Sequence, residues 1–295
     1  GSKLVFTSSA LPGTSATANV LSVSGNIALN ATSTVDVAGG IIGNLTQEAG
    51  QGNLLEQDDN LSHAITLATA GNVTGTANAQ LTVDGKKVES ELQTFAIGED
   101  AVGTYGYKLS GADNKLSVTY GLTKLSVNAG KTVTLGQKGN GDATLDAQVT
   151  GQGGLTIDTA KEVVLANKDN DYTGATNVNE GNLKAEAGAL GQTSSLNVAK
   201  ESTVTLNGAQ SGIQALNVAG TLAVANGALT VNGSNNSVAK LTVAEAGSLT
   251  GSGSLTLTGE GSEIKGANEG FSGDVSLDAG STTVIDNAQG LGSGA

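Results

Sequence analysis

A short pattern of apolar and polar positions recurs along most of the chain. An apolar residue, any residue and a second apolar residue form a triplet, a brief break that often contains Gly follows, and another apolar pair comes next. Within each triplet the apolar and polar positions alternate, which is typical of a β-strand with one buried face. The clearest examples are 21–23 with 27–29, 125–127 with 133–135, 196–198 with 204–206, 216–218 with 222–224, 241–243 with 249, and 275–277 with 284.

The repeat indicates an all-β fold, a right-handed parallel β-helix or β-solenoid. The triplets that begin at 196, 216 and 241 follow one another much more closely than the roughly 40 residues of a propeller repeat would allow. A sandwich would normally use more aromatic residues in its core than the seven of this chain. At about 22 residues per coil the sequence predicts roughly 13 coils, so residues 1–295 are expected to form a single β-helical segment.

Two stretches depart from the repeat. Between 95 and 120, two alternating segments flank a Gly-Ala-Asp-Asn loop, which predicts a β-hairpin that protrudes from the β-helix or covers one of its edges. Helix signals are weak everywhere, and only 45–64, with Leu54 and Leu55, would allow one helical turn.

Composition narrows the classes of function. The net charge is -13, Lys supplies all 14 basic residues, and Cys is absent. Because nucleic-acid phosphates need clustered Lys and Arg, we expect no nucleic-acid partner. Without Cys there is no disulfide framework and no thiolate metal site. We expect no cofactor and no metal, since the calcium-like Gly139-Asn-Gly141-Asp142 is a single incomplete copy.

The sequence offers little for catalysis, and we expect no enzyme and no catalytic residue. His63 is the sole imidazole, and its neighbour Ser62 would point to the opposite face of an extended strand. The alternative function is a β-helical enzyme that acts on polysaccharide. It would need carboxylates at Glu56, Asp58 and Asp59 as general acid and base, without the Arg that such sites normally add.

Tyr105, Tyr107 and Tyr120 are candidate ligand contacts in the hairpin region. Four of the seven aromatic residues lie between 95 and 120. Exposed aromatic side chains dominate binding energetics, so these three would contact a ligand if they face solvent. The alternative is that they cover the hydrophobic edge of the solenoid.

Two segments resemble the passenger-associated transport repeat of Gram-negative autotransporters. The first runs from Asn-Asp-Tyr-Thr-Gly at 170–174 to a Gly near 191, and the second from Asn268 through Phe-Ser-Gly at 271–273 to a Gly near 292. The same interval separates the two central glycines in both copies. The residues that match, to which we assign a structural role, are Asn170, Tyr172, Thr173, Gly174, Gly181, Gly191, Asn268, Phe271, Ser272, Gly273, Gly280 and Gly292.

The resemblance implies a passenger segment of the AIDA type, exported through the outer membrane and displayed on the bacterial cell surface. Such passengers act in adhesion, cell–cell aggregation or biofilm formation, or as the shaft that presents an adhesive tip. The implied partner is a host-surface or matrix ligand, or like passengers on neighbouring cells. The resemblance also implies a C-terminal outer-membrane barrel outside this sequence, and Gly1-Ser2 resembles a remnant of cloning.

Overall fold

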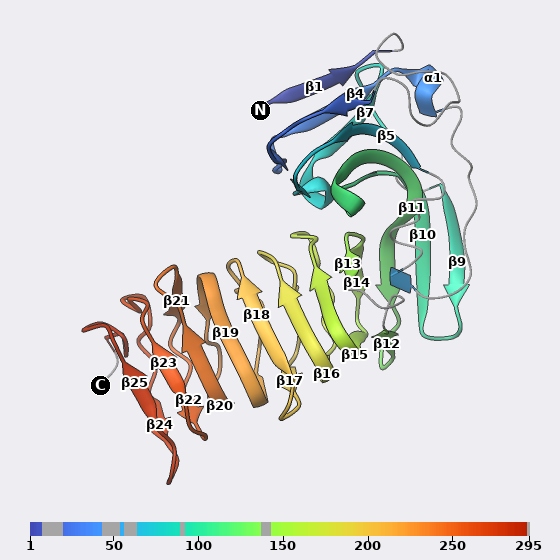
Figure 1. Cartoon of the computed structure of the whole chain (residues 1–295). Helices are drawn as coiled ribbons and strands as arrows, with labels where there is room; N and C mark the ends of the chain where they lie inside the picture. Colours follow the sequence, from blue (N-terminus) through green and yellow to red (C-terminus); the bar gives the residue numbers. More distant parts are fainter. Residues whose placement is uncertain (8–19, 43–53, 56–63, 89–91, 137–142, 294–295) are drawn as a thin grey trace. The chain divides into compact units, whose positions relative to one another are not determined.

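The computed structural model describes all residues except 8–19, 43–53, 56–63, 89–91, 137–142 and 294–295 (Figure 1). The chain forms two compact units. The N-terminal unit comprises Gly1–Ala96 and Gly103–Leu125, and the C-terminal unit comprises Ile97–Val102 and Ser126–Ala295. The regular secondary structure described in both units is almost entirely strand, so the all-β prediction is confirmed.

The C-terminal unit is a stack of parallel coils. Strands of successive coils pair in parallel, as β16 does with β15 of the coil before it and with β17 and β18 of the coil after it, which is the pairing predicted for a β-solenoid. The strands are β12 (Thr132–Leu135), β13 (Ala143–Leu145), β14 (Gln148–Gly151), β15 (Gly154–Leu165), β16 (Thr176–Ala185), β17 (Leu196–Val198), β18 (Thr203–Asn207), β19 (Leu216–Thr230), β20 (Asn236–Val243), β21 (Gly247–Thr250), β22 (Leu255–Leu257), β23 (Ser262–Ile264), β24 (Val275–Leu277) and β25 (Thr283–Ile285).

The register of these strands fixes the length of a coil. Leu155 pairs with Thr176, Thr176 with Leu196, and Leu196 with Leu216, so one coil takes about 20 residues, at the short end for stacked repeats. The solenoid has about 8 turns rather than the roughly 13 that the sequence predicted. The estimate was wrong because it applied one short coil length to the whole chain, and the N-terminal unit does not follow it.

The N-terminal unit contains a much longer coil. β2 (Leu21–Ser22), β3 (Ile27–Ala28) and β4 (Thr34–Val37) pair in parallel with β5 (Ala64–Thr69), β6 (Val73–Thr74) and β7 (Gln80–Val83). The partners are far apart in the sequence, as in Ile27 with Val73 and Leu21 with Ala68. β1 (Lys3–Phe6) pairs in parallel with β4 and forms the edge of that sheet.

The predicted hairpin is present. β10 (Ala101–Ser110) and β11 (Lys115–Val127) are neighbours in one sheet and are joined by a 3-10 turn, Ala112–Asn114. A connection this short requires antiparallel strands. Asp113 and Asn114 have positive φ angles of 52° and 59°, a conformation that these two residue types tolerate best after Gly. β9 (Gln93–Ile97) adds to β10, and β11 pairs antiparallel with β5, so the hairpin extends the sheet of β2 and β5.

Short helical turns complete the N-terminal unit. α1 (Gly39–Ile42) precedes the 45–64 stretch, most of which lies outside the described residues. Its Ile41 and Ile42 are buried, and the Gly39 N–H donates to the Asp84 carboxylate at 3.1 and 3.2 Å. The turn is stabilised by burial of the two isoleucines and by this hydrogen bond to a residue far along the chain. The local sequence therefore did not predict it. The remaining elements are η2 (Thr76–Asn78) and β8 (Lys86–Lys87), which pairs antiparallel with β7.

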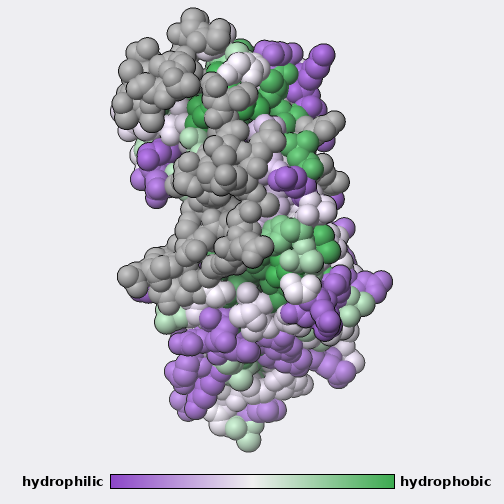
Figure 2. Space-filling view, turned by 90° about the vertical axis from the view of Figure 1, so that its right-hand side faces the viewer, coloured by the Kyte–Doolittle hydropathy of each residue, from purple (hydrophilic) through white to green (hydrophobic). Residues whose placement is uncertain are grey.

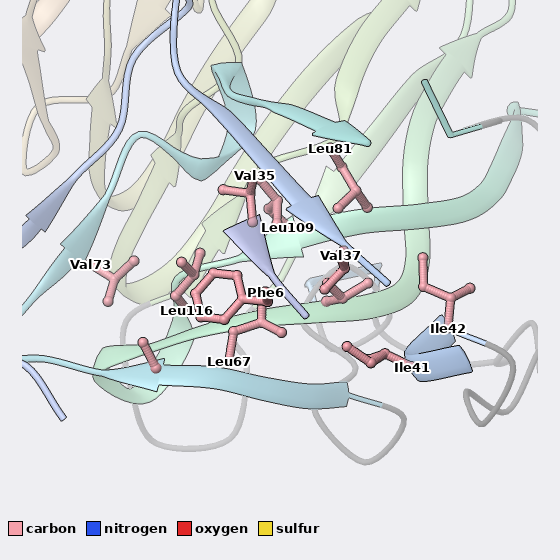
Figure 3. Packing of buried hydrophobic residues seen from close by; sticks show 12 residues of the cluster. Phe6, Val35, Val37, Ile41, Ile42, Leu67, Val73, Leu81, Leu109 and Leu116 are labelled. Carbon is pink, nitrogen blue, oxygen red and sulfur yellow. The ribbon is translucent and has the colours of Figure 1, made fainter. Parts of the chain in front are cut away.

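Aliphatic side chains fill both interiors. In the N-terminal unit, Phe6 from β1, Leu67 from β5 and Leu116 from β11 belong to one cluster of packed buried side chains (Figure 3). In the C-terminal unit the outer residues of each triplet form buried columns along the stack. In one such column Leu155, Leu196, Leu216 and Leu255 are at most 2% exposed. No helix in the described part of the chain has the length and hydropathy needed to cross a membrane.

Candidate binding face

The middle residue of each triplet on one side of the solenoid points outward, because its two neighbours point into the core. Register places these middle residues one above the other through successive coils. Every one of them carries a hydroxyl or an amide, and none carries a charge. We name this column the amide–hydroxyl face, and its members are Thr134, Thr156, Asn177, Asn197, Asn217, Ser237, Thr256 and Ser276.

Hydrogen bonds tie the centre of this face together. The Asn197 side-chain amide donates to the Asn177 carbonyl oxygen at 2.8 Å, and the Asn217 amide donates to the Asn197 oxygen at 3.0 Å. Asn197 also donates to the Ser195 hydroxyl at 3.1 Å. The three amides therefore have fixed orientations, and a partner would meet a pre-ordered row of donors and acceptors.

The residues beside the triplets are also uncharged through five consecutive coils. The flanking residues before the triplets are Ala175, Ser195, Ala215, Asn235 and Ser254, and those after them are Asn179, Ala199, Ala219, Ala239 and Thr258. Charges next to a triplet appear only at the two ends of the column, at Asp158 and at Asp274 and Asp278. The amide–hydroxyl face and the residues beside it are therefore uncharged through these five coils, although the chain has a net charge of -13.

The next row of strands differs. Its outward residues also stack in register, and they include a lysine and a glutamate. We name this column the mixed-charge face: Lys184, Thr205, Ala223, Thr242 and Glu263. Lys184 lies 3.4 Å from Glu186, and Glu263 lies 3.1 Å from Lys265 and raises the pKa of that lysine.

On the side shown in Figure 2, hydrophilic residues predominate in the lower part, which holds the C-terminal unit.

The two asparagines of the repeat segments occupy equivalent buried positions. The Asn170 carbonyl oxygen accepts from the Val149 N–H at 2.7 Å, and its amide donates to the Ala189 oxygen at 2.8 Å. Asn268 bonds in the same way to the Leu249 N–H and the Gly290 oxygen, both at 2.6 Å. Each asparagine thus connects the coil before it to the coil after it. These side chains hold coils together and are not available to a ligand.

The other repeat residues are also placed for packing. Tyr172 and Phe271 are fully buried, and the Tyr172 hydroxyl bonds Thr176 at 2.7 Å. Burial raises the Tyr172 pKa, and the hydrogen bond to Thr176 opposes that rise. Thr173 and Ser272 are exposed and donate backbone N–H groups to the preceding coil. The glycines with positive φ are Gly181, Gly191, Gly280 and Gly292.

Gly174 and Gly273 are required by a close approach of backbones. A Cβ at Gly174 would lie 2.2 Å from the Gly153 carbonyl carbon, and one at Gly273 would lie 1.9 Å from the Gly253 oxygen. Both neighbours belong to the preceding coil. A side chain of any size would push two coils apart at these points.

Sequence reasoning missed two further polar residues that connect coils. The Gln210 side chain accepts from the Leu190 N–H at 3.2 Å and donates to the Glu186 oxygen at 2.6 Å. The Asn236 side chain accepts from the Leu216 N–H at 3.0 Å and donates to the Ser254 oxygen at 2.9 Å. A signal was present at Asn236, which, like Thr176, is a polar residue in a mainly apolar column of the repeat.

The three candidate tyrosines form an aromatic group. Tyr105 and Tyr120 are almost wholly buried, with ring centroids 6.5 Å apart. The Tyr120 hydroxyl donates to the Gln93 side chain at 2.7 Å, and burial raises the pKa of Tyr120. Tyr107 is half-buried, packs edge-on against Tyr120, and lines an open groove of about 400 Å³ beside Lys86 and Lys87. Of the three, Tyr107 alone has the exposure that contact with a ligand would require.

The residues considered for catalysis lie outside the described part of the chain. They are Glu56, Asp58, Asp59, Ser62 and His63, and the same holds for the calcium-like residues 139–142. Among the residues that the structure describes, no group of His, Asp and Glu is arranged to hold a metal ion.

Comparisons with known proteins give two relatives and no functional description. No family model matches the chain, and no solved structure matches it. The chain is 36% identical over 256 residues to "Uncharacterized lipoprotein YdeK" of Escherichia coli K12, covering 82% of this chain and 18% of that protein. It is 33% identical over 258 residues to "Uncharacterized protein YuaQ" of the same strain, again covering 82% and 18%. The chain thus spans less than a fifth of the length of these relatives.

Proposed function

We propose that this chain is a segment of a surface-displayed protein that acts in adhesion or cell–cell aggregation, of the kind found in autotransporter passengers. The observation that carries the proposal is the amide–hydroxyl face. The resemblance of the segments at Asn170 and Asn268 to passenger repeats supports the same function, as does the parallel solenoid that contains them.

The proposed location is membrane-associated or at the cell surface. The name of YdeK describes a lipoprotein, a class of protein attached to a membrane, and this supports the location. Export through the outer membrane is the more specific part of the proposal, and the repeat segments support it.

The amide–hydroxyl face suits contact between two acidic molecules. Two copies, each of net charge -13, repel one another over most of their surfaces. Along this face the middle residues have no charge, so a second copy that docks there brings no like charges into direct contact. The row formed by Asn177, Asn197 and Asn217 offers amide donors and acceptors spaced one coil apart. Each hydrogen bond is weak, and many copies on two cell surfaces would add their contributions through multivalency.

The test is aggregation of beads or cells that display the chain. The face variant combines Asn177→Glu, Asn197→Glu and Asn217→Glu, and it should lose aggregation because it places three like charges on each opposing surface. The matched control adds three glutamates at stacked positions of the mixed-charge face. Its substitutions are Thr205→Glu, Ala223→Glu and Thr242→Glu.

Both variants have the same net charge, so a difference between them reports position. Equal aggregation of the face variant and the control would contradict the proposed role of the face. If the unmodified chain binds neither itself nor host-matrix proteins, it acts as a spacer. That result would favour the shaft over the adhesive segment.

A further inference from the structure

Two carboxylates hold the tight turn that joins β7 to β8. Asp84 and Gly85 form this turn with φ angles of 49° and 77°, the conformation of a two-residue hairpin turn. The Asp36 carboxylate accepts from the Gly85 N–H at 2.9 Å, and the Asp84 carboxylate accepts from the Gly39 N–H at 3.1 and 3.2 Å. The strand that follows the turn, Lys86–Lys87, is therefore held in place by hydrogen bonds to β4 and α1.

This strand presents two lysines without an acidic partner. Lys86 and Lys87 are both exposed, and they are the one place in the sequence where two lysines are adjacent. Among the residues that the structure describes, neither ammonium has a carboxylate within ion-pair distance. Like charges on neighbouring residues repel each other, so an anion bound beside them would be stabilised.

A groove next to the lysines offers an aromatic ring and apolar walls. Its volume is about 400 Å³, within the range of small-ligand pockets, and the described residues that line it all belong to the N-terminal unit. Ile42, Val83 and Val88 supply the apolar surface, and Tyr107 supplies the ring. Tyr107 packs edge-on against the fully buried Tyr120, with 5.6 Å between ring centroids, so its ring has a fixed orientation.

The charged residues of the lining favour an anion. Lys86 and Lys87 both line the groove, although side chains of neighbouring strand residues leave on opposite faces. The long flexible stem of lysine lets either ammonium move toward a bound anion. Asp84 lines the groove too, and its carboxylate accepts from the Gly39 N–H. Two lysines against one aspartate leave the lining with a single positive charge.

A sugar ring that carries a carboxylate fits this combination. The C–H groups of a pyranose pack against the negative face of an aromatic ring such as that of Tyr107. A carboxylate on the same sugar would accept charge-assisted hydrogen bonds from the lysine ammonium groups. An acidic peptide would present its carboxylates on flexible side chains, and ordering these costs entropy that a rigid pyranose does not lose.

We propose that the groove lined by Tyr107, Lys86 and Lys87 binds an acidic saccharide. A uronate residue packs on the tyrosine ring, and the lysines bind its carboxylate. The choice of a saccharide rests on the proposed cell-surface location, and the site is separate from the amide–hydroxyl face. A single groove of this kind binds weakly, and many displayed copies would bind one polysaccharide through multivalency.

The test measures binding of an unsulfated oligosaccharide of glucuronate and N-acetylglucosamine to the full chain by isothermal titration calorimetry. Its carboxyl-reduced form is the matched ligand and should bind about tenfold more weakly, because it cannot accept charge-assisted hydrogen bonds. Lys86→Gln with Lys87→Gln should weaken binding of the acidic form by a similar factor and leave binding of the reduced form unchanged. Tyr107→Ala should weaken binding of both forms, whereas Tyr107→Phe should retain it because the ring remains.

Lys200→Gln with Lys240→Gln is the matched control, since it removes the same charge from exposed lysines of the C-terminal unit. It should bind the saccharide like the unmodified chain. The face variant should also bind the saccharide, so loss of aggregation and loss of saccharide binding report on different sites. Far-UV circular dichroism checks that each variant is folded, and the lysine variants carry the test if Tyr107→Ala is not.

Three results would overturn the inference. They are an unmodified chain that does not bind the acidic oligosaccharide, equal affinity for the acidic and the reduced form, and a Lys86 and Lys87 variant that binds like the control. An acidic peptide that binds as tightly as the oligosaccharide would overturn the choice of ligand.

Discussion

Asn170 and Asn268 combine a polar side chain with almost complete burial, and each satisfies one backbone donor and one backbone acceptor in different coils. Leaving such groups unpaired in the interior costs free energy, so the amide stabilises the stack mainly by preventing that loss. Asn197 makes hydrogen bonds of similar length at the surface, where water can replace them. The two kinds of asparagine should therefore respond differently to substitution.

Asn170→Ala should lower the free energy of unfolding by about 3 kcal/mol, because the Val149 N–H and the Ala189 oxygen lose their partner. Asn197→Ala is the control and should cost about 0.5 kcal/mol or less. Urea unfolding followed by circular dichroism measures both. Equal decreases in the free energy of unfolding for the two variants would contradict the idea that the buried asparagine contributes more than the surface one.

Gly174→Ala should destabilise the C-terminal unit by roughly 2 kcal/mol or more, since the new Cβ would lie 2.2 Å from the Gly153 carbonyl carbon. Gly25→Ala is the control, because a Cβ there meets nothing within 4 Å. Thermal unfolding of the two variants tests this. A Gly174 variant as stable as the control would mean that the two coils can move apart here without loss of stability.

At the scale of the element, β1, β4 and β7 are joined through Asp36. The Lys3 ammonium lies 2.9 Å from this carboxylate, the Thr82 hydroxyl donates to it at 2.7 Å, and the Gly85 N–H donates to it at 2.9 Å. Together, with Lys3 the largest contributor, they lower the Asp36 pKa from 3.8 to about 2. The group connects the three strands most firmly when it is charged.

The stability of the N-terminal unit should therefore depend on pH through Asp36. Because its folded pKa lies below the ordinary value, its contribution is complete above pH 3.8 and is lost as the pH falls through about 2. We expect a contribution of about 1 kcal/mol, since Lys3 is about half exposed and solvent screens the ion pair. Urea unfolding across this range measures it. Asp36→Asn should remove this part of the dependence, and the exposed Asp113→Asn should not.

The strand pattern was predictable at this scale, and the pairing of strands was less so. Alternation identified the triplets in β17 and β24 and the hairpin of β10 and β11, because it reports which side chains face a core. It could not reveal that β4 and β7 pair across a long insertion, as in Thr34 with Gln80. Strands separated in this way find one another through packing, which no local pattern encodes.

For the whole molecule, net charge opposes association. Between two copies of charge -13 the repulsion extends over roughly a Debye length, which shortens as salt is added. Hydrogen bonds across the amide–hydroxyl face depend much less on salt.

Aggregation of displaying cells or beads should therefore increase as sodium chloride is raised from low to physiological concentration. Turbidity or sedimentation of the suspension measures it. Aggregation that weakens steadily with salt would indicate attraction between opposite charges, and would contradict the neutral contact. The effect belongs to the whole molecule because it depends on the summed charge.

The sequence by itself determined the strand content, the parallel solenoid and the glycine-bearing repeats, since alternation and close coil spacing act over short stretches of chain. It also identified Asn170 and Asn268 as structural. Only the tertiary structure decided which outward residues share a face, because the row from Asn177 to Asn217 depends on a constant coil length that holds stacked strands in register. It likewise decided that Tyr105 and Tyr120 are buried while Tyr107 is half-buried, since burial depends on which strand lies alongside.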